Sequence, residues 1–329
     1  MAHASGPVAL VGTTASGKSE VAMSVAVARS DVEIVSVDSM CVYRSMDLAT
    51  AKPTPAARAA VTHHLIDVAD PSQEFTVSEY QRLARAALAG IEARGHRSLL
   101  VGGTGLYLRA VTDGLDLPGR WPEVARALEA DADRPGGLDS LYRRLVAVDP
   151  VAASRIEPGN RRRVVRALEV TIGSGRLFSS FGPGMDVYQP TRIRMIGIPF
   201  VAEVVDPRIE ARVHDWLDRG LVDEVRNLAA RPGGLSRTAR QALGYREILA
   251  HLEQGASLDE CVDQIVRRTR SLARRQWAWF RRDPRIEWVE EGEDPRLRLA
   301  AALDLTGPVA RESGAEVLGS ALGGARLQG

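Results

Sequence analysis

The stretch that decides the fold of this chain is Val8-Ala9-Leu10-Val11-Gly12-Thr13-Thr14-Ala15-Ser16-Gly17-Lys18-Ser19. A short apolar run leads into a loop with the pattern G-x-x-x-x-G-K-[S/T], and an Ala- and Val-rich stretch to about residue 28 predicts a helix. In this setting backbone N–H groups face an anion, and the helix N-terminus adds partial positive charge. The pattern predicts a phosphate-binding loop made of Gly12, Thr13, Thr14, Ala15, Ser16, Gly17, Lys18 and Ser19, hereafter the phosphate loop.

Two side chains of this loop carry the expected chemistry. Lys18 would reach the outer phosphate oxygens, and the Ser19 hydroxyl would ligate Mg²⁺. Of the 43 basic residues in the chain, only Lys18 and Lys52 are lysines. Arginine and lysine differ most where a compact charge is needed, so both lysines are candidates for a functional role.

Further apolar runs predict the rest of the core. They occupy residues 34–37, 99–101 and 194–198, and residues 78–94 read as an amphipathic helix. Short apolar strands that alternate with helices favour a parallel sheet covered on both faces. The predicted fold is α/β, a P-loop parallel sheet core covered by helices, with a helical insertion domain and a largely helical C-terminal part.

The length of 329 residues suggests about two domains or one core with a large insertion. We expect residues 1–116 to form the N-terminal part of the core and residues 117–190, with several Pro-Gly pairs, to form the helical insertion. Residues 191–289 would complete the core and add a basic helical part, with a helix that begins at Asp206-Pro207. The Gly-, Ala- and Glu-rich residues 290–329 predict a partly disordered tail.

Composition excludes several classes of protein. An apolar fraction of 45% is that of a folded protein, and no apolar run approaches the roughly 20 residues that cross a bilayer. The first seven residues carry no Lys or Arg, unlike a signal peptide. Cys41 and Cys261 are too few for a disulfide framework or a zinc site. We therefore expect a cytoplasmic protein without a membrane segment.

Asp38 is the acidic residue nearest to the predicted phosphate site. A P-loop NTPase usually holds Mg²⁺ with an acid at the end of a second apolar strand, but residues 99–101 end in Gly102-Gly103-Thr104-Gly105. Asp38 instead ends the run 34–37. A phosphate loop, one carboxylate facing it and no ordinary hydrolytic apparatus favour group transfer to a second substrate over a motor or a switch.

Several motifs, in the same order, resemble the tRNA dimethylallyltransferase (tRNA isopentenyltransferase) family over about residues 8–288. Besides the phosphate loop they are Val37-Asp38-Ser39-Met40-Cys41-Val42-Tyr43, Ala49-Thr50-Ala51-Lys52-Pro53, His63-His64-Leu65-Ile66-Asp67, Val101-Gly102-Gly103-Thr104-Gly105-Leu106-Tyr107, Arg166-Ala167-Leu168-Glu169-Val170, Ala242-Leu243-Gly244-Tyr245-Arg246 and Arg275-Gln276-Trp277-Ala278-Trp279-Phe280-Arg281-Arg282-Asp283. The chain departs from the family pattern at Thr13, Cys41, Ala49 and Thr62, where Pro, Gln, Gly and Pro are usual.

The resemblance implies an activity and three catalytic residues. The family moves a dimethylallyl group from dimethylallyl diphosphate to N6 of adenosine 37 in tRNAs and releases diphosphate. Asp38 would take the N6 proton, Thr104 would bridge the reacting groups, and Arg226 would help to hold the diphosphate, with Mg²⁺ as the cofactor. The structural alternatives are a turn aspartate at Asp38, a helix-capping threonine at Thr104 and a solvated arginine at Arg226.

Basic residues predict a surface for nucleic acid, although the net charge is only +1. In a helix over residues 262–282, seven arginines fall on one face: Arg267, Arg268, Arg270, Arg274, Arg275, Arg281 and Arg282. The resemblance implies that a tRNA anticodon stem-loop binds a monomer through Asp38, Ser39, Met40, Cys41, Arg162, Arg163, Arg166, Gln241, Gly244, Tyr245, Arg246, Arg274, Arg275, Gln276 and Arg281.

Two features stay open at this point. Lys52 would contact phosphate or the tRNA backbone, and His63 and His64 are expected to be structural, since two histidines alone make a weak metal site. Two other functions compete with the prenyltransferase. One is a small-molecule kinase that uses ATP, with Asp38 on an acceptor hydroxyl, and the other is a non-catalytic RNA-binding protein. A kinase of small metabolites has no use for a long arginine face. A non-catalytic RNA-binding protein would leave the complete phosphate loop and Asp38 without a purpose.

Overall fold

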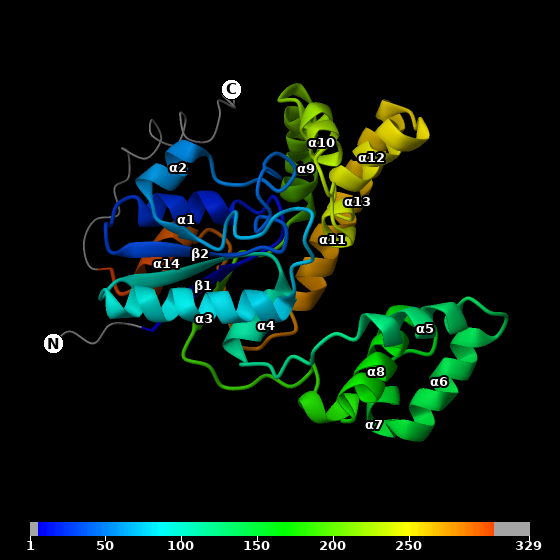
Figure 1. Cartoon of the computed structure of the whole chain (residues 1–329). Helices are drawn as coiled ribbons and strands as arrows, with labels where there is room; N and C mark the ends of the chain where they lie inside the picture. The colour runs from blue at the N-terminus through cyan, green and yellow to red at the C-terminus, as the bar shows by residue number, and fades with distance from the viewer. Residues whose placement is uncertain (1–5, 306–329) are drawn as a thin grey trace. The chain divides into compact units, whose positions relative to one another are not determined.

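The computed structural model describes residues 6–305, and its centre is a six-stranded sheet in which all neighbouring strands are parallel (Figure 1). The strand order is β3-β2-β4-β1-β5-β6. The predicted α/β class is confirmed. The strands are β1 (Val8–Val11), β2 (Val32–Val37), β3 (His63–His64), β4 (Arg97–Gly102), β5 (Arg194–Gly197) and β6 (Ile286–Trp288).

The strand β1 lies between β4 and β5 and is completely buried. Its side chains alternate between two hydrophobic cores, one on each face of the sheet. Ala9 and Val11 belong to one core, and Val8 and Leu10 belong to the other. A strand buried on both faces needs an unbroken apolar run, which explains why this stretch of sequence predicted its position so well.

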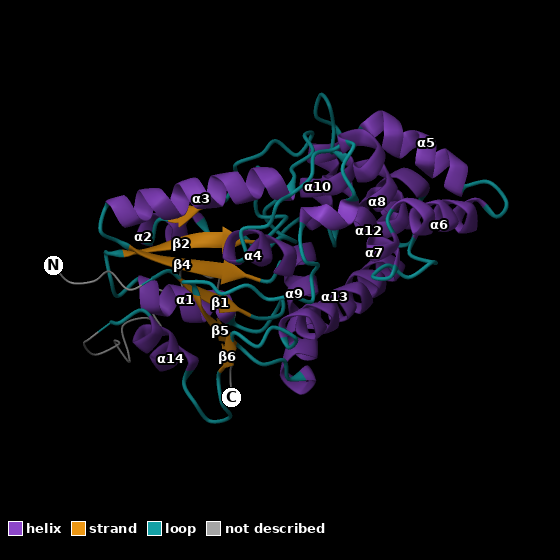
Figure 2. Cartoon of the chain, turned by 90° about the horizontal axis from the view of Figure 1, so that it is seen from below, coloured by secondary structure: helices purple, strands orange, loops and turns teal. Residues whose placement is uncertain are grey.

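Helices cover both faces of the sheet (Figure 2). One core takes side chains from α1, α2 and α14, and the other takes them from α3, α4 and α9 to α13. The helices of this unit are α1 (Lys18–Ala26), α2 (Pro55–Ala60), α3 (Val77–Ala93), α4 (Gly105–Thr112), α9 (Ala202–Asp218), α10 (Leu221–Ala229), α11 (Arg237–Arg240), α12 (Tyr245–Gln254), α13 (Leu258–Phe280) and α14 (Pro295–Ala302).

A second compact unit comprises Asp113–Gln189. The sequence predicted this insertion at residues 117–190. It has its own hydrophobic core, which includes Leu128, Leu141 and Leu145. Its regular elements are all helical: α5 (Pro122–Ala132), α6 (Gly137–Val148), α7 (Pro150–Ala153), α8 (Arg161–Ser174) and the 3₁₀ helix η1 (Phe178–Phe181).

Two sequence predictions need correction. Residues 290–305 are folded, because α14 buries Leu299 against α1 and the Leu303 carbonyl accepts a hydrogen bond of 2.9 Å from Arg97. The rest of the predicted tail, residues 306–329, lies outside the described residues. The helix α9 begins at Ala202 rather than at Asp206, and Pro207 lies inside it. The proline removes one helical hydrogen bond, while the added turn buries Val205.

A buried carboxylate ties β2 to β3 and to the segment that enters β4. Glu33 of β2 is only 4% exposed. It accepts two hydrogen bonds from Arg94, and it is hydrogen-bonded at 2.7 Å to both His64 of β3 and His96, which precedes β4. Burial opposes ionisation, but these bonds outweigh it and lower the pKa of Glu33 to about 2. The contact with Glu33 thus gives His64, one of the two histidines of the His63-His64 pair, a structural role.

We expect Glu33→Gln to lower the free energy of unfolding at pH 7 by about 2 kcal/mol, because hydrogen bonds to a charged group are lost. A folded pKa below the unfolded value means that the stabilisation is present above about pH 4.3 and is lost toward pH 2. The deficit of the variant should therefore shrink below about pH 4. Denaturant titrations of the wild type and of Glu33→Gln at neutral and acidic pH measure this difference in unfolding free energy. A difference that does not change with pH would contradict a stabilising role for the ionised carboxylate of Glu33.

Candidate active site

The phosphate loop joins the end of β1 to the start of α1. Gly17 precedes α1 with a φ of +88°, in the left-handed region that favours glycine, and Ala15 also has a positive φ of +59°. Backbone N–H groups at the start of α1 have no partner within the helix, and they carry the positive end of its dipole. The loop thus has the local geometry of an anion-binding site, as its sequence predicts.

Lys18 lies at the centre of a group of charges. Its Nζ donates a hydrogen bond of 2.9 Å to the Thr13 carbonyl. Burial lowers the pKa of Lys18 to about 8, the charge of Asp38 opposes this shift, and the charge of Arg212 adds to it. A bound anion would therefore replace missing solvation around an ammonium group that the fold has already enclosed.

Asp38 and Thr104 meet beside the phosphate loop because they follow neighbouring strands. Asp38 follows β2 and Thr104 follows β4, and both strands point toward the same edge of the sheet. The Ser39 amide donates to the Thr104 Oγ1 at 3.1 Å, and the Thr104 amide donates to the Val37 carbonyl at 3.1 Å. The structure thus brings together the phosphate loop and two of the three predicted catalytic residues.

The Asp38 carboxylate also organises its own turn. Its Oδ1 accepts hydrogen bonds from the amides of Met40 at 2.8 Å and Cys41 at 3.1 Å. This is the turn role that the sequence left open, and it orients the carboxylate rather than excluding a chemical role. The Thr104 hydroxyl bonds to the turn at Ser39, which makes it part of the same arrangement.

Gln276 of α13 holds the phosphate loop from the far end of the chain. Its Oε1 accepts a hydrogen bond of 2.8 Å from the Thr14 amide, and its Nε2 donates one of 3.0 Å to the Gly103 carbonyl. A Cβ atom at Gly103 would lie 2.5 Å from this Nε2, so a larger residue there would displace the amide. The tRNA contact at Gln276 stays a prediction, and the structure gives this side chain a further role at the phosphate loop.

Arg226 does not join this group in the structure. It is exposed on α10 and pairs with Asp223. The arginines near Lys18 come from α9: the charge of Arg212 acts on Lys18, and an Nη1 of Arg208 lies 3.6 Å from where a Cβ of Gly17 would stand. Arg208 and Arg212 were missed, although their i, i+4 spacing, beside the buried positions Val205 and Ile209 of one helix, was a signal for a shared face.

The segment at residues 241–246 divides into exposed and buried side chains. Gln241 and Arg246 are exposed and available to a ligand. Tyr245 is completely buried and its hydroxyl donates to Glu224, so the side-chain contact with tRNA that the resemblance implies is closed to it here. Gly244 has a φ of +86°, and a Cβ there would lie 2.7 Å from the Cβ of Ala49.

Cys41 is also turned away from a bound partner. It is 6% exposed, its Sγ lies 3.4 Å from the Thr50 carbonyl, and burial raises the pKa of the thiol. Its neighbours Ser39 and Met40 are half-buried at the surface of the site. At this turn the structure therefore presents residues 38–40, while Cys41 packs beneath them.

The arginine face of α13 is less uniformly positive than its own sequence indicates. Arg268 pairs with Glu247 of α12, Arg270 with Glu210 of α9 at 2.7 Å, and Arg274 with Asp206 of α9 at 2.7 Å. The acids that pair with these arginines come from α9 and α12, which the sequence of α13 does not contain. Several others remain at the surface, namely Arg267, Arg275, Arg281 and Arg282.

The basic cluster of the second unit lies at the start of α8. Arg162 and Arg163 are exposed. Arg166 is half-buried, pairs with Glu169 at 2.8 Å, and donates to the carbonyls of Pro118 at 2.9 Å and Gly119 at 2.8 Å. Arg166 thus holds the segment at Pro118 and Gly119, which leads into α5. Arg162 and Arg163 are the side chains of this cluster that are exposed to a ligand.

Residues 6–305 contain neither a cluster of metal ligands nor a membrane-spanning helix. Within that range, no group of three or more His, Cys, Asp or Glu side chains is arranged to hold a metal ion. His63 contacts the Val61 carbonyl and His64 contacts Glu33, in keeping with their predicted structural role. Across the same residues, every helix is too short or too polar to span a membrane.

Comparison with known proteins identifies the family. The family model described as IPP transferase matches residues 41–283. A tRNA dimethylallyltransferase of Geobacter metallireducens is 47% identical over 85% of this chain and 90% of its own, and one of Roseiflexus castenholzii is 47% identical over 90% and 96%.

A solved structure agrees with these relatives. The tRNA isopentenylpyrophosphate transferase of Bacillus halodurans is 35% identical, with a TM-score of 0.65 over 91% of this chain and 97% of its own. The fold and site define a P-loop transferase scaffold. The chain belongs to the IPP transferase family.

Removal of the Gln276 amide should weaken the phosphate loop. We expect Gln276→Leu to reduce the affinity for inorganic diphosphate about 10-fold, because the hydrogen bond from the Thr14 amide of the loop and the one to the neighbouring Gly103 carbonyl are lost. Calorimetric titration with inorganic diphosphate and Mg²⁺ measures the effect. Gln264→Leu, about three turns earlier on α13, is the matched control and should bind as the wild type does. Equal affinities for all three proteins would show that the loop holds its shape without Gln276.

Proposed function

We propose that this protein is a tRNA dimethylallyltransferase that transfers a dimethylallyl group from dimethylallyl diphosphate to N6 of adenosine 37 in tRNAs. The reaction forms N6-isopentenyladenosine and releases diphosphate. The observation that carries the proposal is the meeting of the phosphate loop, Asp38 and Thr104 at the carboxyl edge of the sheet in a member of this family. Substrates and acceptor follow from the names of its relatives and from the chemistry of this site.

The phosphate loop and its cationic neighbours suit a diphosphate leaving group. As the bond between the allylic carbon and oxygen breaks, negative charge grows on oxygens that would face Lys18, Arg208, Arg212 and the amides before α1. Ser19 is exposed directly after Lys18, so its hydroxyl fits as the protein ligand of a Mg²⁺ ion carried by the diphosphate. When bound, Mg²⁺ would neutralise part of the charge on the leaving group.

Asp38 suits the acceptor side of the reaction. The exocyclic amine of adenine is a weak nucleophile, because its lone pair is delocalised into the ring. As the bond from N6 to the allylic carbon forms, one N6 proton passes to the Asp38 carboxylate and diphosphate departs with the electrons of the broken bond. The hydrogen bonds that Met40 and Cys41 give to Oδ1 would hold the carboxylate in place for this step. The base must leave the anticodon-loop stack to reach it.

Basic side chains on both units suit the phosphate backbone of a tRNA. They are exposed on α13, directly after its last residue and at the start of α8, and they include Arg275, Arg281, Arg162 and Arg163. Such contacts position a nucleic acid without reading its sequence. We therefore assign backbone binding to these arginines, and selection of adenosine 37 to residues 38–40 and their neighbours.

The direct test is transfer of label. The purified protein is incubated with unmodified tRNA, Mg²⁺ and radiolabelled dimethylallyl diphosphate, and the modified nucleoside is identified after digestion. We expect label on N6 of adenosine 37. Consumption of ATP with phosphorylation of a small acceptor, and no label on tRNA, would instead indicate a kinase. Binding of tRNA without either reaction would indicate an RNA-binding protein.

Substitution of Asp38 separates its role in transfer from a role in diphosphate binding. Asp38→Asn keeps the shape and one acceptor oxygen but cannot take the proton, so we expect turnover to fall by about 10²–10⁴-fold. Affinity for dimethylallyl diphosphate with Mg²⁺ should stay near that of the wild type. A parallel loss of both quantities would assign Asp38 to Mg²⁺ or diphosphate binding, and unchanged turnover would remove it from the mechanism.

Arg275 and Arg274 form a matched pair for testing tRNA binding. Arg275 is exposed and donates to the Ser271 hydroxyl, whereas the charge of Arg274 is already paired with Asp206. We expect Arg275→Ala to lower the slope of log affinity against log salt by about one, and Arg274→Ala to change it clearly less. Filter binding of tRNA at several salt concentrations measures both slopes. Equal slopes for both variants would mean that the ion pair with Asp206 opens when tRNA binds.

A further inference from the structure

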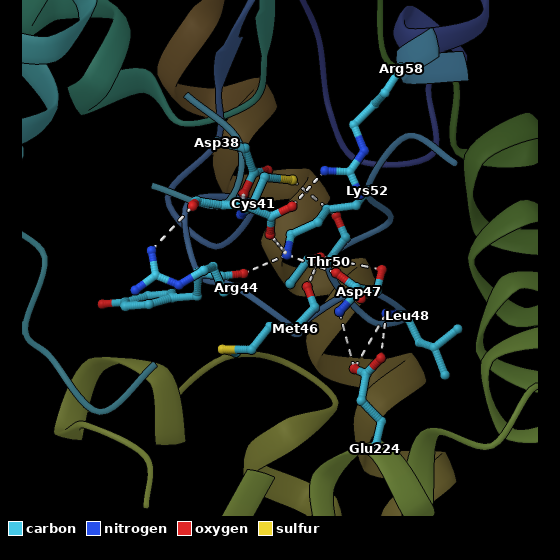
Figure 3. Close-up of polar contacts among 12 residues, drawn as sticks. Asp38, Cys41, Arg44, Met46, Asp47, Leu48, Thr50, Lys52, Arg58 and Glu224 are labelled. Atoms are coloured by element: carbon cyan, nitrogen blue, oxygen red, sulfur yellow. Dashed lines mark hydrogen bonds and ion pairs between the residues drawn. The ribbon is translucent and has the colours of Figure 1, made fainter. Parts of the chain in front are cut away.

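Lys52 is a buried ammonium group that the proposed reaction does not use. Its side chain is 2% exposed, so the phosphate or tRNA contact expected from the sequence is closed to it. Its Nζ donates to three acceptors: the Tyr43 carbonyl, Asp47 Oδ1 at 2.8 Å and Asp67 Oδ1 at 2.6 Å. Figure 3 shows Lys52 beside Asp47. An ammonium group has three N–H donors, and each acceptor can take one.

This geometry explains why a lysine stands here in a chain that otherwise uses arginine. Of the 43 basic residues, 41 are arginines, and Lys52 is one of the two exceptions. A guanidinium is planar and directs its donors in a fixed fork, whereas an ammonium is compact and its donors diverge. Three acceptors that surround one buried point select the ammonium.

The acceptors belong to two segments that Lys52 joins. Tyr43 and Asp47 lie in residues 38–52, which we call the acceptor loop because it begins at Asp38, and Asp67 follows β3. The loop has its own internal bonds, including one of 2.6 Å from the Thr50 hydroxyl to the Met46 carbonyl. Lys52 therefore connects the far end of the acceptor loop to the edge of the sheet.

A second side chain holds the loop from the opposite side. The carboxylate of Glu224 on α10 accepts hydrogen bonds from the amides of Asp47 at 3.2 Å and Leu48 at 3.3 Å (Figure 3). It also accepts one from the Tyr245 hydroxyl. Asp47 is thus contacted from both sides, through its side chain by Lys52 and through its amide by Glu224. This also gives the buried Tyr245 a structural role.

The backbone on both sides of Lys52 needs such support. Ser45 and Ala51 in the acceptor loop have φ values of +61° and +52°, and Leu65 and Asp67 in the partner segment have +63° and +58°. A left-handed conformation costs a residue with a side chain of order 1 kcal/mol, and it persists only where surrounding contacts hold it. The contacts that Lys52 makes join these two strained segments.

We propose that Lys52 is a positioning residue for the acceptor step: it holds the acceptor loop so that Asp38 and the neighbouring residues 39–40 face the target adenosine. This inference rests on the proposed function. In the described part of the chain, the hydrogen bonds of Lys52 go to Tyr43, Asp47 and Asp67, and none of these residues belongs to the phosphate loop. Its effect therefore falls on the tRNA side of the reaction. Binding of the prenyl diphosphate is expected to proceed without it.

Arg58 provides a matched control. Its Nη1 pairs with the other oxygen of Asp67, Oδ2, and its side chain is 33% exposed. Lys52→Met and Arg58→Met each remove one cationic partner of Asp67, but only Lys52→Met also removes the bonds to Tyr43 and Asp47. A purely structural ion pair would make the two variants alike, whereas a positioning role makes them different.

The experiment measures transfer by the full-length protein at varied tRNA concentration, with calorimetry of dimethylallyl diphosphate binding and denaturant unfolding. For Lys52→Met we expect kcat/KM for tRNA to fall about 30- to 100-fold, the scale of a misplacement of about 1 Å. Affinity for dimethylallyl diphosphate should stay within about 3-fold, and Arg58→Met should keep kcat/KM within about 3-fold. Lys52→Arg retains the charge without the geometry, so it should resemble Lys52→Met.

Each other result overturns the inference. Equal losses in Lys52→Met and Arg58→Met would make Lys52 an ordinary structural ion pair, and full rescue by Lys52→Arg would reduce its role to charge. A parallel loss of diphosphate affinity would move its effect to the phosphate loop. If Lys52→Met does not fold, Lys52→Arg against Arg58→Met decides the same question. A wild-type protein that transfers no label would remove the proposed function together with this inference, whereas the other outcomes leave that function standing.

Discussion

The parallel alignment of β2, β4 and β1 is the constraint on which the site depends. In their register Val11 and Val37 both lie opposite Gly102, so three strands end at the same level. The residues that follow them, the phosphate loop, Asp38 and the turn to Thr104, must then meet at one edge. The strands approach so closely at their ends that a Cβ on Gly102 would lie 2.1 Å from the Val37 carbonyl. Glycine at this position is therefore a condition of the site.

The two lysines of the chain place a compact ammonium group where the fold offers backbone carbonyls as acceptors. Lys18 and Lys52 are both enclosed, and each donates to backbone carbonyls that a compact ammonium can approach from one side. Around Lys18 the compensation is incomplete, which lowers its pKa and leaves it suited to an incoming anion. Around Lys52 three acceptors are already in place, so that group has the contacts of a structural tie. The same side chain thus serves opposite purposes because the number of fixed acceptors differs.

The helix α13 links the two halves of the proposed reaction. One side of its C-terminal part presents arginines to solvent, and Gln276 on the same helix holds the phosphate loop and the Gly103 turn. Trp279 lies against Gly105, where a Cβ would come within 2.2 Å of the indole nitrogen. A helix that contacts both the expected RNA track and the diphosphate site needs close docking, which small residues at positions 103 and 105 permit.

Local patterns in the sequence determined the strand at residues 8–11, the phosphate loop, the helical insertion and the place of Asp38 at the end of its strand, because each depends on neighbours in the chain. Tertiary structure alone decided the contact between Thr14 and Gln276, 262 residues apart, the burial of Tyr245 and Lys52, and the ion pairs that neutralise part of α13. Folding also placed Arg208 and Arg212, rather than Arg226, beside Lys18. The physical reason is that solvent exposure and charge compensation depend on what packs against a residue, and those partners come from distant segments.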